Sequence, residues 1–207
     1  MDTSGSAGDN ATALRDGQFD NRIQGLGALL AAQDMSKPPP VDKWDPPYCG
    51  DIGMAIESDG TWFYQGSPIG RKPLVQLFAR VLRRDADGRH YLVTPVEKVD
   101  VKVEDAPFLA VEMEVEGSGR DATVIFRTNV DDIVRCGPDN PLRFEKEPGS
   151  GGLKPYVLVR GRLEALVTRA IYYDLVEMAI SSQDRPEGVG GDQPGIWSGG
   201  KFFALAA

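Results

Sequence analysis

Two glycine corners that carry basic side chains are the first feature of this sequence that could bind a ligand. In each corner a strand-like segment runs into a glycine flanked by bases and then into a helix-like segment. A cation in the first turn of a helix opposes the helix dipole, whereas a bound anion is favoured there by free N–H groups and by the bases. The corners therefore predict a bipartite anion site, and the alternative is that these side chains are solvated or pair with nearby acids. The basic residues of the two corners are Arg71, Lys72, Arg160 and Arg162.

The corners do not match the motifs of nucleotide hydrolases, and catalytic constellations are scarce. A Walker loop needs a Ser or Thr after its Lys, but Lys72 is followed by Pro73. His90 is the single histidine, so a Ser-His-Asp triad would depend on it alone and a multi-histidine metal site cannot form. Cys49 has no flanking base to activate its thiol. We therefore predict no catalytic residue, no metal ligand and no cofactor.

Polar and aromatic side chains near predicted strand ends could complete a ligand site. In the segment TPVEK, Pro95 fixes a turn at which Thr94, Glu97 and Lys98 converge, and the segment FRTN places Arg127 and Asn129 at a strand end. The alternative for both segments is ordinary turn capping. An aromatic face can stack on a base without regard to its identity. The aromatic residues expected to do so are Trp62, Tyr64 and Tyr172.

The N-terminal half predicts a helix, a strap, a hairpin and a second helix. Apolar spacing indicates helices over Arg22–Gln33 and Pro73–Leu82. The prolines of KPPPVDKWDPP predict an extended strap over Lys37–Pro47, anchored by Trp44. The pair Asp59-Gly60 favours a tight turn between strands Ile52–Glu57 and Thr61–Gln65.

The C-terminal half predicts short strands followed by one long helix. Alternating apolar residues indicate strands with one buried face, and a helical stripe begins at Leu163 and runs to Met178. We therefore predict an α+β protein whose C-terminal part is a small barrel or sandwich capped by a helix. The expected strands are 91–93, 99–103, 109–116, 123–128, 133–136, 142–145 and 156–160.

These elements group into two small domains with repeated strand-to-helix motifs. The glycine, serine and proline content outside them predicts a disordered tail over residues 1–18 and a flexible tail over residues 182–207. We expect an N-terminal α+β domain over residues 19–90 and a C-terminal barrel-like domain over residues 91–181. The similar corners in the two domains hint at duplication.

Composition limits the partners. The 207 residues carry a formal net charge of −8, which argues against nucleic acid and anionic membranes as partners, because both require a positive field. No stretch approaches the roughly 20 apolar residues of a membrane span. Cys49 and Cys136 are too few for a disulfide scaffold, so we expect a cytoplasmic protein.

Several long segments resemble, in this order, the bacterial family labelled domain of unknown function 1285. They are CGDIGMAIESDGTWFYQGSPIGRKPLVQLF, YLVTPVEKVDVKVEDAPFLAVEME, FRTNVDD and PYVLVRGRLEALVTRAIYYDLVE. The resemblance implies a two-domain α+β protein with internal repeats, whose C-terminal domain is similar to a pleckstrin-homology barrel. It also implies a site for a nucleotide-like ligand at the domain interface and a role in signal transduction.

Together, the residues and the resemblance favour a cytoplasmic sensor or adaptor that binds a small anionic, nucleotide-like ligand between its domains. Two other function classes stay open. One is a protein-interaction module, whose sheet edge or aromatic strap binds a protein partner in signalling. The other is an enzyme such as a phosphoesterase, which would need a metal or a general base that the sequence does not display.

Overall fold

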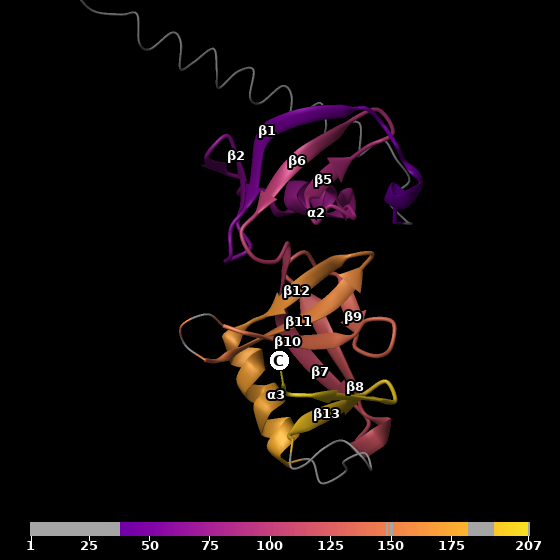
Figure 1. Cartoon of the computed structure of the whole chain (residues 1–207), viewed down its shortest axis with the longest axis vertical. Coiled ribbons are helices and arrows are strands. Elements are labelled where there is room, and N and C mark those ends of the chain that lie inside the picture. Colours follow the sequence, from indigo (N-terminus) through magenta and orange to yellow (C-terminus); the bar gives the residue numbers. More distant parts are fainter. Residues whose placement is uncertain (1–37, 148, 150, 182–192, 207) are drawn as a thin grey trace, which may run out of the picture.

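The chain folds into two lobes that are stacked along its long axis (Figure 1). The computed structural model describes residues 38–147, 149, 151–181 and 193–206. These residues form two six-stranded sheets, a two-stranded hairpin, two α-helices and two short 3-10 helices. The tail over residues 1–18 and the predicted helix Arg22–Gln33 lie outside the described residues.

The first lobe is built from two antiparallel three-stranded units joined side by side. Its strand order is β3-β2-β1-β6-β5-β4, and all neighbours are antiparallel except β1 and β6. Helix α2 (Lys72–Arg80) connects the two units and lies on the side of the sheet that faces the second lobe (Figure 1). The strands are β1 (Tyr48–Ile56), β2 (Trp62–Tyr64), β3 (Ser67–Pro68), β4 (Leu82–Arg84), β5 (His90–Val93) and β6 (Lys98–Val103).

The second lobe repeats this arrangement. Its strand order is β9-β8-β7-β12-β11-β10, and β7 and β12 form the one parallel pair among its described neighbours. Helix α3 (Arg169–Ser181) follows the last strand and packs along the curled sheet (Figure 1). The strands are β7 (Phe108–Glu116), β8 (Thr123–Thr128), β9 (Ile133–Arg135), β10 (Leu142–Lys146), β11 (Leu153–Arg160) and β12 (Leu163–Val167).

The two sheets therefore share one topology, in which the first strand of each lobe pairs in parallel with the sixth. The repeat differs from the one that the sequence predicts. Gly70 lies before helix α2, but Gly161 lies in the tight turn between β11 and β12 and precedes a strand. The repeat is thus one of sheets, and the position of the helix differs between the lobes.

The domain boundary lies further along the chain than residue 90. Strands β5 and β6 pair with each other and with β1, so they belong to the first sheet. The first strand of the second sheet begins at Phe108. The expected boundary is wrong because alternating apolar residues predict a strand but not the sheet in which it finds a partner.

The last helix begins six residues after its predicted start. Leu163, Ala165 and Val167 are buried and alternate with half-buried residues in β12. The apolar pattern of these five residues fits a strand as well as a helix. They form a strand because they pair with β11 on one side and with β7 on the other. Helix α3 then starts at Arg169.

The C-terminal residues 193–206 are not a flexible tail. Strands β13 (Gly195–Ser198) and β14 (Lys201–Ala204) form a hairpin that closes the bottom of the second lobe (Figure 1). Ser198 accepts a hydrogen bond from Val124 N at 2.8 Å and donates one to Cys136 O at 2.7 Å. The hairpin thus satisfies buried backbone groups of the sheet, and the glycines that suggested mobility form its turn. Residues 182–192 and 207 of the predicted tail lie outside the described part.

Each lobe has an apolar interior, and the proline-rich strap covers part of the first one. Trp62 and Phe78 stack in the first lobe, and Phe108 and Phe126 are fully buried in the second. Trp44 and the short helix η1 (Val41–Lys43) pack on the core, so the strap contains one turn of 3-10 helix within its extended path. None of the helices in the described residues is long and apolar enough to cross a membrane.

Candidate functional site

The two lobes meet through the turn between β8 and β9. Asp131 is its key residue, because its carboxylate contacts Lys72 Nζ at 2.8 Å, Gln76 Nε2 at 2.8 Å and Arg127 at 2.6 Å. Lys72 and Gln76 belong to helix α2 of the first lobe. Hydrogen bonds from Lys72 and then Arg127 lower the pKa of Asp131. Its φ of +68° is a left-handed conformation that Asp tolerates better than most residues.

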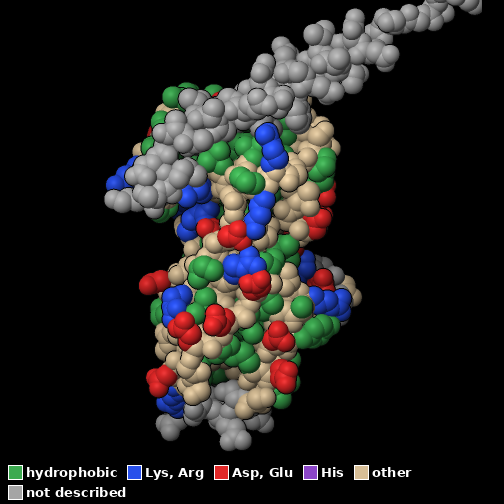
Figure 2. Space-filling view, turned by 180° about the vertical axis from the view of Figure 1, so that it is seen from behind, with side chains coloured by type: hydrophobic (Ala, Val, Ile, Leu, Met, Phe, Trp, Pro, Cys, Tyr) green, Lys and Arg blue, Asp and Glu red, His purple; other side chains and the backbone are tan. Residues whose placement is uncertain are grey.

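Arg160 makes a second contact across the same boundary. Its guanidinium pairs with Asp132 and donates a hydrogen bond from Nη2 to Ala79 O at 2.7 Å. Ala79 lies in the last turn of α2, where backbone carbonyls have no partner within the helix. The side chain also lies over the ring of Phe108, 5.1 Å from its centroid. Basic and acidic side chains lie close together at the waist between the lobes (Figure 2).

One base of each predicted corner, Lys72 and Arg160, therefore contacts a carboxylate of the same turn, and these carboxylates belong to the protein. Arg71 is the N-cap of α2, while Arg160 contacts its last turn. With a rise of about 1.5 Å per residue, the two ends of this nine-residue helix are roughly 12 Å apart. The prediction that Arg71 and Arg160 share one bound anion at two helix starts is therefore wrong, since β12 and not a helix follows Gly161.

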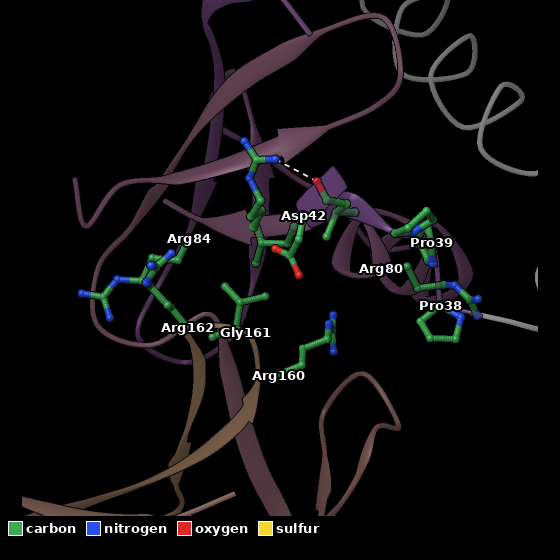
Figure 3. A pocket seen from close by; sticks show the side chains of 13 residues that line it. Pro38, Pro39, Asp42, Arg80, Arg84, Arg160, Gly161 and Arg162 are labelled. Carbon is green, nitrogen blue, oxygen red and sulfur yellow. Dashed lines mark hydrogen bonds between the residues drawn. The ribbon is translucent and has the colours of Figure 1, made fainter. Parts of the chain in front are cut away.

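A different basic site lies on the other side of Arg160. A cavity of about 320 Å³ opens between the strap, the end of α2, strand β4 and the β11–β12 turn (Figure 3). Both lobes contribute to its wall, and of its described lining residues Asp42 alone is acidic. Five arginines line it, namely Arg80, Arg83, Arg84, Arg160 and Arg162.

These arginines differ in how much of their hydrogen-bonding capacity is used. Arg162 has no hydrogen-bond or ion-pair partner among the described residues. Arg84 donates only from Nε, to Gly88 O at 3.2 Å, among the interactions of the described chain. Both side chains extend to the same end of the cavity, one from each lobe (Figure 3). This end of the cavity therefore offers a ligand the guanidinium group of Arg162 and the Nη1 and Nη2 donors of Arg84.

Arg83 has a structural task in the cavity wall. Its Nη1 donates to Val41 O and Trp44 O, both at 2.8 Å, and its Nε donates to Asp85 at 2.6 Å. The two carbonyls flank Asp42 in the strap. Arg83 therefore holds the strap against β4 and fixes the backbone on both sides of Asp42.

The electrostatics of the cavity favour an anion. Arginine remains charged at every physiological pH, so Arg84 and Arg162, which have no carboxylate partner among the described residues, repel each other. Arg84 also acts on its neighbour in the sheet: burial and then the charge of Arg84 lower the pKa of His90 to about 4. A phosphate or carboxylate would reduce this repulsion and accept charge-assisted hydrogen bonds from both lobes.

Two groups of sequence-predicted site residues have structural roles instead. Trp62 and Tyr64 are buried, with 1% and 2% of their surface exposed, so neither can stack on a ligand. Trp62 Nε1 is buried without a partner in the described residues. The hydroxyl of Thr94 accepts hydrogen bonds from the backbone N–H groups of Val96 and Glu97, as turn capping requires. Glu97 closes that turn through its carbonyl.

The remaining predicted residues lie outside the cavity as well. Lys98 pairs with Asp85 at 3.3 Å. Arg127 and Asn129 belong to the interface: Arg127 pairs with Glu112 and Asp131, and Asn129 exchanges hydrogen bonds with the backbone of Leu109. Tyr172 lines a separate cavity of about 430 Å³ beside α3.

That second cavity is larger but offers fewer free charges. Its Lys154 pairs with Asp105 at 2.8 Å, and its Arg169 donates to Tyr173 at 3.1 Å. No group of three potential metal-ligating side chains occurs within the described ranges. Burial raises the pKa of Cys136 to about 11, so its thiol is protonated at neutral pH. The cavity between the lobes is therefore the candidate site.

Sequence reasoning identified Arg160 and Arg162 but missed the other half of this site. Arg80, Arg83 and Arg84 occur within five positions of one another, which is a local basic cluster. Such a cluster after a helix is also what the helix dipole favours, so its spacing alone does not distinguish a site from a helix end. Asp42 gave no signal, because its place in the cavity wall depends on where the strap lies.

Comparisons with known proteins agree with the observed division of the chain. A model of "Domain of unknown function (DUF1285), N-terminal domain" matches residues 39–106, and one of "Protein of unknown function (DUF1285), C-terminal domain" matches residues 107–205. No curated protein matches the chain.

Two solved structures are similar to the chain. A DUF1285 family protein from Silicibacter pomeroyi DSS-3 is 46% identical, with a TM-score of 0.77, and the match covers 87% of this chain and 93% of that one. A DUF1285 family protein from Shewanella baltica OS155 is 27% identical, with a TM-score of 0.49, over 61% of this chain and 92% of that one.

Proposed function

The chain belongs to the DUF1285 family, and from that premise we propose that its interdomain cavity binds a small phosphate-bearing ligand of nucleotide-like size. One observation carries the proposal: guanidinium groups from both lobes, on Arg84 and Arg162, reach the same end of one cavity with N–H donors that no described residue accepts. Because the net charge of the chain is −8, this positive site is local. It therefore attracts a small anion and not an extended polyanion.

The role that we propose for this binding is a sensor in cytoplasmic signal transduction. A ligand that contacts both lobes stabilises the arrangement in which both of them can bind it. A protein partner that binds this arrangement more tightly would therefore respond to the ligand. The two free cysteines of the described chain support a reducing compartment. For the second lobe we propose a pleckstrin-homology-like relationship, on the basis of its two three-stranded units and the helix that follows them.

Calorimetry with the full chain tests the proposal. We expect AMP, ADP or a cyclic nucleotide to bind with a dissociation constant below 1 mM, by analogy with charge-assisted phosphate contacts. Arg162→Ala and Arg84→Ala should each weaken that binding about tenfold, the size of one lost charged hydrogen bond.

Arg71→Ala is the matched control, because Arg71 is an exposed arginine of the first lobe that lies outside the cavity. It should bind the same nucleotide as tightly as the wild type. Absence of millimolar binding by every nucleotide, or an equal loss in the Arg71 variant, overturns the proposal. A protein partner that is still captured by Arg162→Ala without any nucleotide supports the interaction-module alternative.

A further inference from the structure

We infer that the ligand of the interdomain cavity carries a hydrogen-bond-donating group, and best an ammonium, at a second position apart from its phosphate. This inference rests on the proposed function, because it concerns the same cavity. It assigns to Asp42 the role of selecting among phosphate-bearing ligands.

The first support is the chemistry of the wall. Asp42 is the acidic member of a wall with five arginines, yet it pairs with none of them and has no side-chain partner among the described residues. An aspartate whose task was to neutralise these arginines would be expected to form an ion pair, as Asp132 does with Arg160. Asp42 keeps both carboxylate oxygens free to accept hydrogen bonds.

The second support is the position of Asp42. Figure 3 shows its carboxylate pointing from the strap toward Arg160 and Gly161, into the space that the wall encloses. The backbone on both sides is fixed, because Arg83 binds the carbonyls of Val41 and Trp44. The Asp42 carboxylate therefore projects from a backbone segment that Arg83 holds in place.

A carboxylate at this place discriminates between two classes of anion. A ligand whose only polar group is a phosphate can bind the arginines but forms no hydrogen bond with Asp42. The carboxylate of Asp42 also repels the negative charge of the phosphate. A ligand with a phosphate at the Arg84 and Arg162 end and an ammonium or hydroxyl at Asp42 satisfies both. A cavity of about 320 Å³ is at the small end for ligand sites, which suits a compact ligand of this kind.

Pairs of isosteric probes test the inference with the full chain. Calorimetry first compares 2-aminoethyl phosphate with n-propyl phosphate. It then compares longer pairs, in which both molecules have one to three further methylene groups. The series is needed because the distance from the arginines to Asp42 determines which chain length binds best. We expect the wild type to bind the best amine about fivefold more tightly than its alkyl partner, the upper range for an exposed ion pair. Asp42→Asn should abolish that preference and bind the alkyl phosphate more tightly than the wild type does.

Asp45→Asn is the matched control, because Asp45 is an exposed aspartate of the same strap outside the cavity. It should keep the wild-type preference. Equal binding of amine and alkyl probes by the wild type, or a preference that survives Asp42→Asn, overturns the inference while phosphate binding stands. Absence of binding by every probe overturns the inference alone if a nucleotide still binds, and it overturns the proposed function as well if no nucleotide binds.

Vesicles containing phosphatidylethanolamine separate two sources of this chemistry. Sedimentation of the wild type with these vesicles, lost in Asp42→Asn, assigns the ligand to a lipid headgroup. Binding of the soluble amine without sedimentation assigns it to a free small molecule.

Discussion

Arg83, Arg160 and Arg162 carry the same charged group but meet different partners. Arg83 holds the strap, Arg160 joins the lobes, and Arg162 has no partner in the described part of the chain. Substitution of the first two would therefore change the structure as well as any binding. Arg162 is the arginine whose loss should report on the ligand alone.

His90 makes the stability of the first lobe depend on pH. Burial and Arg84 lower its pKa from 6.5 to about 4, and it lies between β4, which carries Arg84, and β6. Between these values the unfolded chain binds a proton that the folded protein does not, so the free energy of unfolding should fall as pH falls from about 6.5 to about 4. We expect a loss of about 1–2 kcal/mol, after allowance for solvent screening at a partly exposed group.

Urea unfolding at intervals between pH 7 and pH 4 measures this loss. The variant His90→Gln, which does not titrate, should show a smaller slope across the same range. An identical slope in the two proteins would mean that carboxylates and not His90 determine the pH dependence.

At the scale of elements, the turns of each lobe form the contact between the lobes. The β8–β9 turn lies against α2, and Gly60, in the turn between β1 and β2, approaches Asn129 of the same β8–β9 turn. A Cβ atom added to Gly60 would lie 2.6 Å from Asn129 Nδ2 and 3.1 Å from Leu109 Cδ1. The tight turn at Gly60 thus connects β1 to β2 and also packs against the second lobe.

Gly60→Ala should destabilise the protein more than an equivalent change elsewhere. Both Gly60 and Gly66 have φ near +80°, at +81° and +79°, but a Cβ on Gly66 would meet nothing within 4 Å. We expect Gly66→Ala to cost about 1 kcal/mol through backbone strain, and Gly60→Ala roughly 2–3 kcal/mol because the contact with Asn129 is added. Chemical unfolding of both variants compares them, and equal costs would contradict a tight contact at Gly60.

At the scale of the whole molecule, charged groups at the waist add to the contact between two lobes whose buried apolar residues form one continuous cluster. Lys72, Gln76 and Arg127 share the carboxylate of Asp131, and Arg160 links Asp132 to the end of α2. Exposed ion pairs are individually weak and are screened by salt. The relative position of the lobes should therefore respond to ionic strength more than the fold of either lobe does.

Asp131→Asn should loosen the contact without unfolding either lobe. Asn tolerates the left-handed backbone at this position, so the substitution removes the charge and one acceptor oxygen without straining the backbone. We expect faster hydrogen exchange in α2 and in the β8–β9 turn, while β11 and β12 stay protected. Asp139→Asn, at an exposed aspartate without a partner among the described residues, is the control. Exchange in α2 that is the same in both variants would show that Asp131 does not hold the lobes together.

The sequence by itself predicted the local elements where two signals agree. The pair Asp59-Gly60 between alternating apolar residues indicated the first hairpin, and the apolar stripe with Pro73 indicated helix α2 to within two residues. It could not separate a strand from a helix at Leu163–Val167, because five residues satisfy both periods. The same limit hid the C-terminal hairpin, whose glycines also suit a mobile tail.

Only the tertiary structure decided which charges meet. Net charge, free cysteines and the scarcity of catalytic motifs follow from composition, which contains no distances. Arg71 and Arg160 have similar sequence surroundings, yet a strand after Gly161 and a helix after Gly70 direct them to opposite ends of α2. Arg84, Arg162 and Asp42 come from three distant segments of the chain but line one cavity. They come together because β4 and β12 pair within their sheets and because Arg83 holds the strap. Such long-range pairing depends on the packing of the whole chain, so the site could be recognised only once the lobes were placed.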